Sequence, residues 1–118
     1  MKHALKTLSS VLVAGLLMTG CANQNKPLYH WGSYQPQVYE YFKGDGNSTE
    51  AQIIALEAEM EKARASDAKL PPGYHAHLAM LYSKVGRMDQ AKQEFELEKT
   101  LYPESASFID YLMRNFKK

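Results

Sequence analysis

The chain lacks several features that define common classes of protein. It has one cysteine among 118 residues, so no intrachain disulfide can form. Its net charge is only +1, which gives no reason to expect nucleic-acid binding. It has no Ser/His/Asp set and no run of glycines that could cradle a phosphate. We therefore expect no enzymatic activity, no catalytic residue, no metal and no bound cofactor.

The hydrophobic stretch near the N-terminus is too short to cross a membrane. Residues 8–18 are apolar or small, about half of the roughly 20 residues that a transmembrane helix needs. Lys2 and Lys6 precede this stretch, which is the charge pattern of a secretory signal peptide. We predict a signal peptide over residues 1–20. Its removal would lower the basic count from 14 to 12, against 13 acidic residues, and leave a nearly neutral chain.

The residues around the single cysteine resemble the lipobox of bacterial lipoproteins. In Leu17-Met18-Thr19-Gly20-Cys21, small residues come directly before the cysteine. The resemblance implies cleavage before Cys21, a diacylglyceryl group on its thiol and an acyl chain on its new amino group. Lipoproteins kept at the inner membrane carry Asp at the next position, so Ala22 implies the outer membrane, with the domain facing the periplasm. The alternative is an ordinary signal peptide followed by an unrelated free cysteine.

A polar tether over residues 21–27 precedes one predicted all-α domain over residues 28–118. Its clearest block runs from Pro71 to Tyr102, where apolar residues recur at helical spacing in two stripes separated by Gly86. Two helices joined by a tight turn bury such stripes against each other as an antiparallel pair. The stripes are formed by Tyr74, Leu78, Leu81, Tyr82 and Val85, and then by Met88, Ala91 and Phe95.

This block resembles a tetratricopeptide repeat. The residues at that motif's signature spacings are Leu78, Ala79, Tyr82, Gly86, Ala91, Phe95 and Pro103. Two positions depart from the motif, since His75 stands where Trp is common and Glu98 stands where a small residue usually packs. The resemblance implies a short stack of helical hairpins whose first helices line a concave side that binds proteins. Stable stacks need about three repeats, so neighbouring helices must complete this one.

Helices are predicted on both sides of the repeat. Asn47 and Glu50 fit a capping pair for a helix that reaches about Asp67, and Ser105 can cap a last helix. A short helix is also expected over residues 38–42. The apolar sides of the two longer helices are formed by Ile53, Leu56, Met60 and Ala63, and by Phe108, Ile109, Leu112 and Phe116.

Two groups of residues are candidates for binding a partner. The resemblance to the repeat places Ala76, Met80, Ser83 and Lys84 on the concave side, where Met80 offers an adaptable apolar contact and Lys84 a charge. Met80 could equally fill a gap against Met60. Trp31 and Tyr34, in an aromatic segment that continues to Phe42, could dock a partner or pack over the first groove of the stack.

The remaining polar residues give little sign of chemistry. His75 and His77 would project about 200 degrees apart on a helix and so could not readily share a metal ion. His30 has no Asp, Cys or second His at a useful spacing, and we interpret it as an ordinary polar ring beside Trp31. Alternating acids are interpreted as a solvated helix face. These are Glu57, Glu59 and Glu61, and Glu94, Glu96 and Glu98.

The lipobox, the Trp-Gly aromatic segment and the helical pair together resemble a family of small bacterial lipoproteins of unknown function. Its members are often encoded beside a lipoprotein similar to the curli secretion channel. The resemblance implies an interaction or assembly factor in an outer-membrane complex of several lipoproteins. Its partners would be other envelope proteins, the channel-like lipoprotein among them. The alternative is a structural lipoprotein that tethers the outer membrane to the cell wall.

Overall fold

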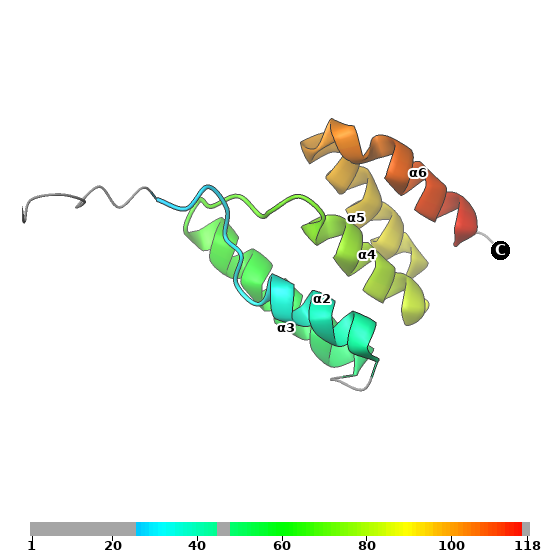
Figure 1. The fold of residues 1–118 in the computed structure, drawn as a ribbon, viewed down its shortest axis with the longest axis horizontal. Coiled ribbons are helices and arrows are strands. Elements are labelled where there is room, and N and C mark those ends of the chain that lie inside the picture. The colour runs from blue at the N-terminus through cyan, green and yellow to red at the C-terminus, as the bar shows by residue number, and fades with distance from the viewer. Residues whose placement is uncertain (1–25, 45–47, 117–118) are drawn as a thin grey trace, which may run out of the picture.

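The computed structural model describes residues 26–44 and 48–116, in which five α-helices follow one another along the chain (Figure 1). The helices are α2 (Tyr34–Lys43), α3 (Thr49–Ala65), α4 (Tyr74–Lys84), α5 (Met88–Leu101) and α6 (Ala106–Asn115), with a 3-10 helix, η2 (Pro103–Ser105), between the last two. The described residues form no strand, and a single bridge joins Tyr29 to Lys69. The prediction of an all-α fold is confirmed.

Two predictions at the N-terminal side fall wholly or partly outside this range. The predicted signal peptide and Cys21 lie outside the described residues, and so does Asn47, the predicted cap. The structure caps α3 with Ser48 instead, because the Ser48 hydroxyl accepts a hydrogen bond from the Ala51 N–H at 3.2 Å. Over the described part of the chain, every helix is too short or too polar to span a lipid bilayer.

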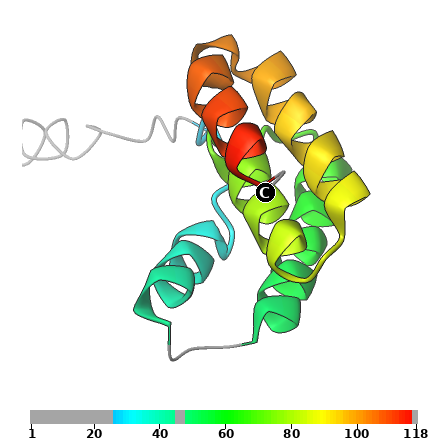
Figure 2. The same ribbon diagram turned by 90° about the vertical axis from the view of Figure 1, so that its right-hand side faces the viewer.

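The helices are arranged in two layers. Each helix packs on its neighbours in sequence, and the contact between α4 and α5 is the most extensive. Figure 2 shows α2, α4 and α6 on one side of the molecule and α3 and α5 on the other. We call these the inner layer and the outer layer.

The hydrophobic core lies between the layers, and the predicted hairpin supplies much of it. The buried residues at the repeat's signature positions are Leu78, Ala79, Tyr82, Ala91 and Phe95, and they pack with Ile53, Leu56, Tyr74, Leu81 and Ile109. Gly86 lies in the turn between α4 and α5 with a φ of 78°, a conformation that favours glycine. Pro103 begins η2 directly after α5. The hairpin predicted from Pro71 to Tyr102 is therefore present.

The two terminal helices differ from their predictions in detail. α2 is longer than predicted, because Pro36 lies in its first turn, where no helical hydrogen bond is lost. Ser105 stands at the N-cap of α6, but its hydroxyl donates to the Tyr102 carbonyl at 2.7 Å, so the predicted capping bond is wrong. Phe108 was placed on the buried side but is 55% exposed, because the buried face of α6 is centred on Ile109, about 100° away around the helix.

Candidate functional site

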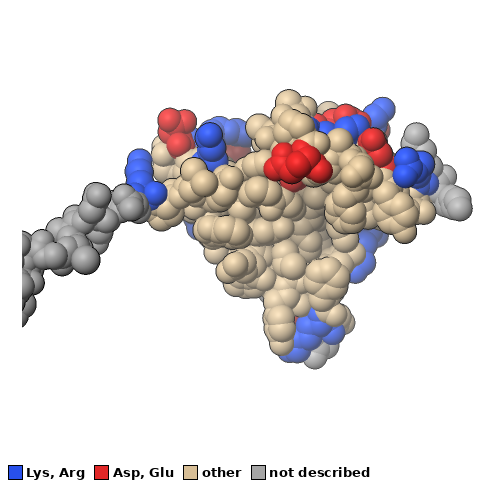
Figure 3. All heavy atoms as spheres, turned by 45° about the horizontal axis from the view of Figure 1, so that its top comes forward, with Lys and Arg blue, Asp and Glu red and all other residues tan. Residues whose placement is uncertain are grey.

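The candidate binding surface is the side of the inner layer that faces away from α3 and α5. The inner layer carries few charged side chains, namely Glu40, Lys43, Lys84, Asp110 and Arg114, whereas α3 and α5 each carry six. Figure 3, with the top of the molecule turned forward, shows a broad face of uncharged side chains, with Lys and Arg mostly near its edges and a cluster of Asp and Glu in its upper part. The inner layer therefore offers a surface with few charges.

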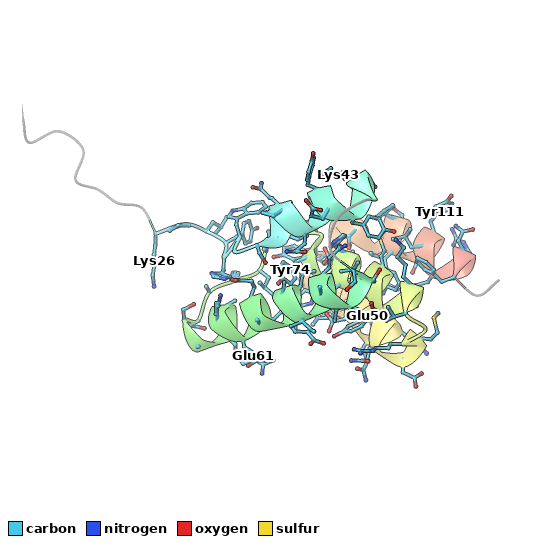
Figure 4. The ribbon with its side chains drawn as sticks, turned by 90° about the horizontal axis from the view of Figure 1, so that it is seen from below. Lys26, Lys43, Glu50, Glu61, Tyr74 and Tyr111 are labelled. Atoms are coloured by element: carbon cyan, nitrogen blue, oxygen red, sulfur yellow. The ribbon has the colours of Figure 1, made fainter. Side chains whose placement is uncertain are left out.

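Aromatic side chains are exposed on the two helices that flank this surface. They are Tyr39 and Phe42 on α2, which are 62% and 76% exposed, and Phe108 and Tyr111 on α6, which are 55% and 57% exposed. Figure 4 shows Tyr111 at the periphery of the molecule, whereas Tyr74 is enclosed between α2 and α3. The exposed hydrophobic residues of the outer layer are aliphatic, and include Ile54, Leu97 and Leu101.

A chain of ring contacts connects the predicted docking residues. Trp31 stacks on Tyr34 with 6.3 Å between ring centroids, and Tyr34 contacts His77 at 6.0 Å. His77 in turn contacts Tyr41 at 5.2 Å, and the Lys84 Nζ lies 4.4 Å from the centroid of the Tyr41 ring. Trp31, Tyr34 and Lys84 are thus brought into one row along α2 and α4. Tyr34 and Tyr41 are half-buried within it, while Trp31 is 45% exposed.

The other three predicted concave residues are less accessible. Ala76 is buried, and Met80 is half-buried against the core. The Ser83 hydroxyl donates to the Ala79 carbonyl at 2.9 Å. Ser83 also lines a hollow of about 230 Å³ between the first half of α5 and the end of α6, together with Phe95, Phe116 and others. Lys84 is the most exposed of the four predicted residues.

The two histidines of α4 have separate environments. His77 is buried, and burial, with a smaller contribution from the Lys84 charge, lowers its pKa to about 4. Its Nε2 has no hydrogen-bond partner among the described residues. His75 faces the outer layer, where its Nδ1 lies 2.6 Å from Glu94 Oε2. Within residues 26–44 and 48–116, no group of three or more His, Cys, Asp and Glu could hold a metal ion.

Glu98 overturns the interpretation of the alternating acids as a solvated face. Its side chain is 1% exposed, and its two carboxylate oxygens accept hydrogen bonds from the N–H of Gly73 at 2.7 Å and of Ala76 at 3.3 Å. Gly73 is the N-cap of α4 and has no side chain that could cap the helix. Glu98 therefore satisfies free N–H groups at the positive end of the α4 dipole.

Three more acids of the outer layer are bound within the molecule. Glu57 accepts a hydrogen bond from the Tyr82 hydroxyl at 2.5 Å. Glu59 Oε2 lies 2.7 Å from His30 Nε2. Two hydrogen bonds lower the pKa of Glu59, and the one from Lys62 contributes more than the one from His30. His30 thus has an acidic partner, Glu59, that the spacing of residues in the sequence did not indicate. The third acid is Glu94, already paired with a histidine.

Part of this arrangement has a signal in the sequence. Glu98 follows Ala91 at position i+7 and Phe95 at position i+3, which places all three on one face of α5. Since Ala91 and Phe95 are core residues of the repeat, the same spacing predicts that Glu98 is buried. Only Glu61 and Glu96 among the six alternating acids are exposed.

Comparison with known proteins gives one family and no characterised relative. Residues 28–112 match a domain of unknown function, DUF4810. No curated protein and no solved structure gives a match. The matched range includes α2 to α5 and the first part of α6, so it takes in both layers.

Proposed function

We propose that this chain, which belongs to the DUF4810 family of unknown function, is a protein-binding module of the bacterial envelope. The proposal is based on the side chains that its surface exposes. In this proposal Cys21 carries the lipid that its lipobox resemblance implies, and the domain faces the periplasm from the outer membrane. The module acts as an interaction or assembly factor in a complex with other envelope lipoproteins. The lipoprotein similar to the curli secretion channel is the first partner to test.

The binding proposal rests on one observation: the inner layer exposes aromatic rings but carries few charged residues. Charged residues are depleted, and aromatic residues enriched, at the centres of protein interfaces. Tyr and Trp are also common among the residues that contribute most to binding. Phe42 and Tyr111 expose more than half of their surface on helices with two charged residues each. Covering these rings removes apolar surface from water without stripping water from charged groups.

The surface fits an apolar segment of a partner protein, such as one face of an amphipathic helix. Three helices side by side offer rows of side chains between which such a face can lie. Lys84, held over the Tyr41 ring, supplies one positive charge for orientation. Met80 lies at the edge of the core, where its flexible side chain can adjust to the partner.

The test compares the inner layer with the outer layer. The double variant Phe42→Ala/Tyr111→Ala removes two exposed rings, and the control Ile54→Ala/Leu97→Ala removes two exposed aliphatic side chains from α3 and α5. The lipidated proteins are captured from solubilised envelopes, and the proteins bound to them are quantified by mass spectrometry. The inner-layer variant is expected to lose bound partner about tenfold or more, as when residues central to binding are truncated. The control is expected to retain it.

Other outcomes separate the parts of the proposal. Equal capture by both variants, or loss only in the control, would contradict binding through the inner layer. The variant Met80→Ala/Lys84→Ala tests the centre of the same surface and should also weaken capture. Recovery of cell wall in place of a protein partner would favour the tethering alternative. Cys21→Ala is expected to release the protein from the membrane fraction, and a protein that stays bound would contradict the lipid anchor.

A further inference from the structure

We infer that the leading segment, residues 28–33, is a second membrane contact that inserts Leu28 and Trp31 among the lipid headgroups. This inference rests on the proposed function through the lipid on Cys21. The contact would set the orientation of the domain on the membrane as well as its distance from it. Its occupant is the phospholipid surface of the leaflet that holds the anchor.

The short distance along the chain from Cys21 keeps the start of the fold close to the membrane in an anchored protein. Residues 22–26 span at most about 18 Å when fully extended, since each residue adds roughly 3.6 Å. That length is smaller than the hydrocarbon thickness of a bilayer, which is about 30 Å. The part of the fold that begins at Lys26 is therefore held next to the headgroups.

The side chains at this end are of the kinds that favour a membrane interface. Leu28 is 71% exposed and Trp31 is 45% exposed, with Tyr29 between them in the chain. Trp and Tyr are enriched at the boundary between headgroups and acyl chains. Lys26 and Lys69 are exposed and have no carboxylate within ion-pair distance among the described residues, so both are available to anionic lipids.

The leading segment is held firmly against the rest of the fold. The His30 N–H donates to the Lys69 carbonyl at 2.7 Å, and the His30 ring is paired with Glu59 at 2.7 Å. Trp31 stacks on Tyr34, the first residue of α2. These contacts present the Leu28 and Trp31 side chains on a fixed support. Because folding already orders this segment, its insertion into the membrane costs little further conformational entropy.

A hollow beside the leading segment has room for a headgroup. It measures about 410 Å³ and lies between residues 26–30 and residues 66–69. Lys26 and Lys69 both line it, and Asp67 is its one acidic lining residue. A phosphate there would meet two ammonium groups, whose positive charges would attract its negative charge.

This orientation leaves the inner layer free for a partner. Figure 4 shows Lys26 toward the end of α3 that carries Glu61, while Lys43 and Tyr111 lie toward the opposite end of the molecule. Docking through the leading segment therefore directs Phe42 and Tyr111 away from the lipid. Membrane contact and partner binding use different parts of the surface.

Fluorescence can test the contact directly, because Trp31 is the only tryptophan in the chain. The full-length lipidated protein is reconstituted into vesicles of equimolar phosphatidylethanolamine and phosphatidylglycerol. The acyl chains carry bromine either near the headgroup or near the methyl end. Trp31 emission is expected to shift to shorter wavelength and to be quenched more by the bromine near the headgroup, since interfacial apolar faces lie about 5–10 Å deep.

Two matched variants keep Trp31 and change one exposed aliphatic side chain each. Leu28→Glu is expected to lose most of the quenching, because a carboxylate at the insertion point opposes both burial and anionic lipid. Ile54→Glu, at a residue 66% exposed in the first turns of α3, is expected to retain it. Circular dichroism checks that both variants keep their helices. Equal quenching in the two variants would overturn the role of Leu28 and with it the docking surface.

Failure of the docking and failure of the anchor give different results. A protein that floats with the vesicles but shows no quenching of Trp31 would overturn the docking and leave the lipid anchor intact. A protein that does not float at all would overturn the anchor, and the docking with it. Trp31 emission that changes only on addition of a captured partner would assign the leading segment to protein binding instead.

Discussion

The inner and outer layers differ in where their polar and aromatic side chains point. In the outer layer, four of the acids on α3 and α5 are turned into the molecule, namely Glu57, Glu59, Glu94 and Glu98. In the inner layer, four aromatic rings are exposed to solvent, namely Tyr39, Phe42, Phe108 and Tyr111. These eight residues reverse the usual rule that charged groups face water and rings are buried.

The difference indicates that the two layers serve different purposes. The outer-layer acids join elements that are far apart in sequence, since Glu98 caps α4 and Glu59 holds the leading segment. Their removal should therefore change the stability of the fold. The exposed rings of the inner layer have few contacts among the described residues, where Phe42 meets the neighbouring Tyr41 ring and Tyr39 lies near Lys43. If the proposed function is right, their removal should change binding. Substitutions can separate these two effects.

The largest effect on stability is expected from Glu98→Ala. The substitution leaves the half-buried N–H group of Gly73 and the buried N–H group of Ala76 without this acceptor and removes a side chain that is 1% exposed. Hydrogen bonds to charged groups contribute about 1.5–3 kcal/mol each, so we expect a loss of about 3–4 kcal/mol in the free energy of unfolding. Urea denaturation followed by circular dichroism measures it.

The control for this prediction is two residues away on the same helix. Glu96 is exposed and lies 3.6 Å from Lys99, so Glu96→Ala is expected to change stability by less than about 0.5 kcal/mol. Glu98→Gln, which keeps an acceptor for one of the two N–H groups, should give an intermediate loss. If Glu98→Ala were as stable as Glu96→Ala, the capping of α4 by Glu98 would be refuted.

The sequence was sufficient to predict the hairpin because its signals are local. Leu78 and Tyr82 lie four residues apart on one helix, and Gly86 and Pro103 mark where the helices end. Such features depend on spacing within one element, and the structure contains them as predicted. The all-α class and the two flanking helices follow from the same kind of pattern.

The pairings between elements could not be predicted in this way. His30 and Glu59 are separated by 29 residues, and their contact depends on how the leading segment crosses α3. Periodicity tells which residues share a face of a helix but not which faces meet. Glu98 belongs to both kinds of feature. Its burial could be predicted from the spacing of the core residues on α5, but its hydrogen bond to Gly73, which joins two elements, could not.

The second effect concerns pH and the contact between α2 and α4. His77 lies against Tyr34 and Tyr41 of α2, and its pKa falls from 6.5 to about 4 on folding, chiefly because it is buried. Between these values the unfolded chain binds a proton that the folded chain does not. Stability is therefore complete above about pH 6.5 and declines as the pH falls toward 4, by up to roughly 3 kcal/mol.

The variant His77→Leu isolates this contribution from that of the carboxylates. Its unfolding free energy, measured by urea denaturation from pH 7 to pH 4, should decline less steeply than that of the unaltered protein. The difference between the two slopes belongs to His77, and among the described residues Lys84 is the charged neighbour that affects its pKa. Parallel curves for the two proteins would show that His77 is not held neutral beneath α2.

The smallest effect on stability is expected at the exposed rings, and it is the sharpest test of the contrast between the layers. Phe42 and Tyr41 are adjacent on α2, but Phe42 is 76% exposed, while Tyr41 is half-buried between His77 and Lys84. Phe42→Ala is expected to change the free energy of unfolding by less than about 0.5 kcal/mol, and Tyr41→Ala to lower it by about 1–2 kcal/mol. Urea denaturation of both variants gives the comparison.

If Phe42→Ala were as destabilising as Tyr41→Ala, the exposed rings would be needed for the stability of the fold. Lost partner capture in Phe42 variants would then no longer report on binding. A negligible cost at Phe42 would instead mean that folding does not depend on its exposed ring, so that lost partner capture in Phe42 variants would report on binding and not on unfolding.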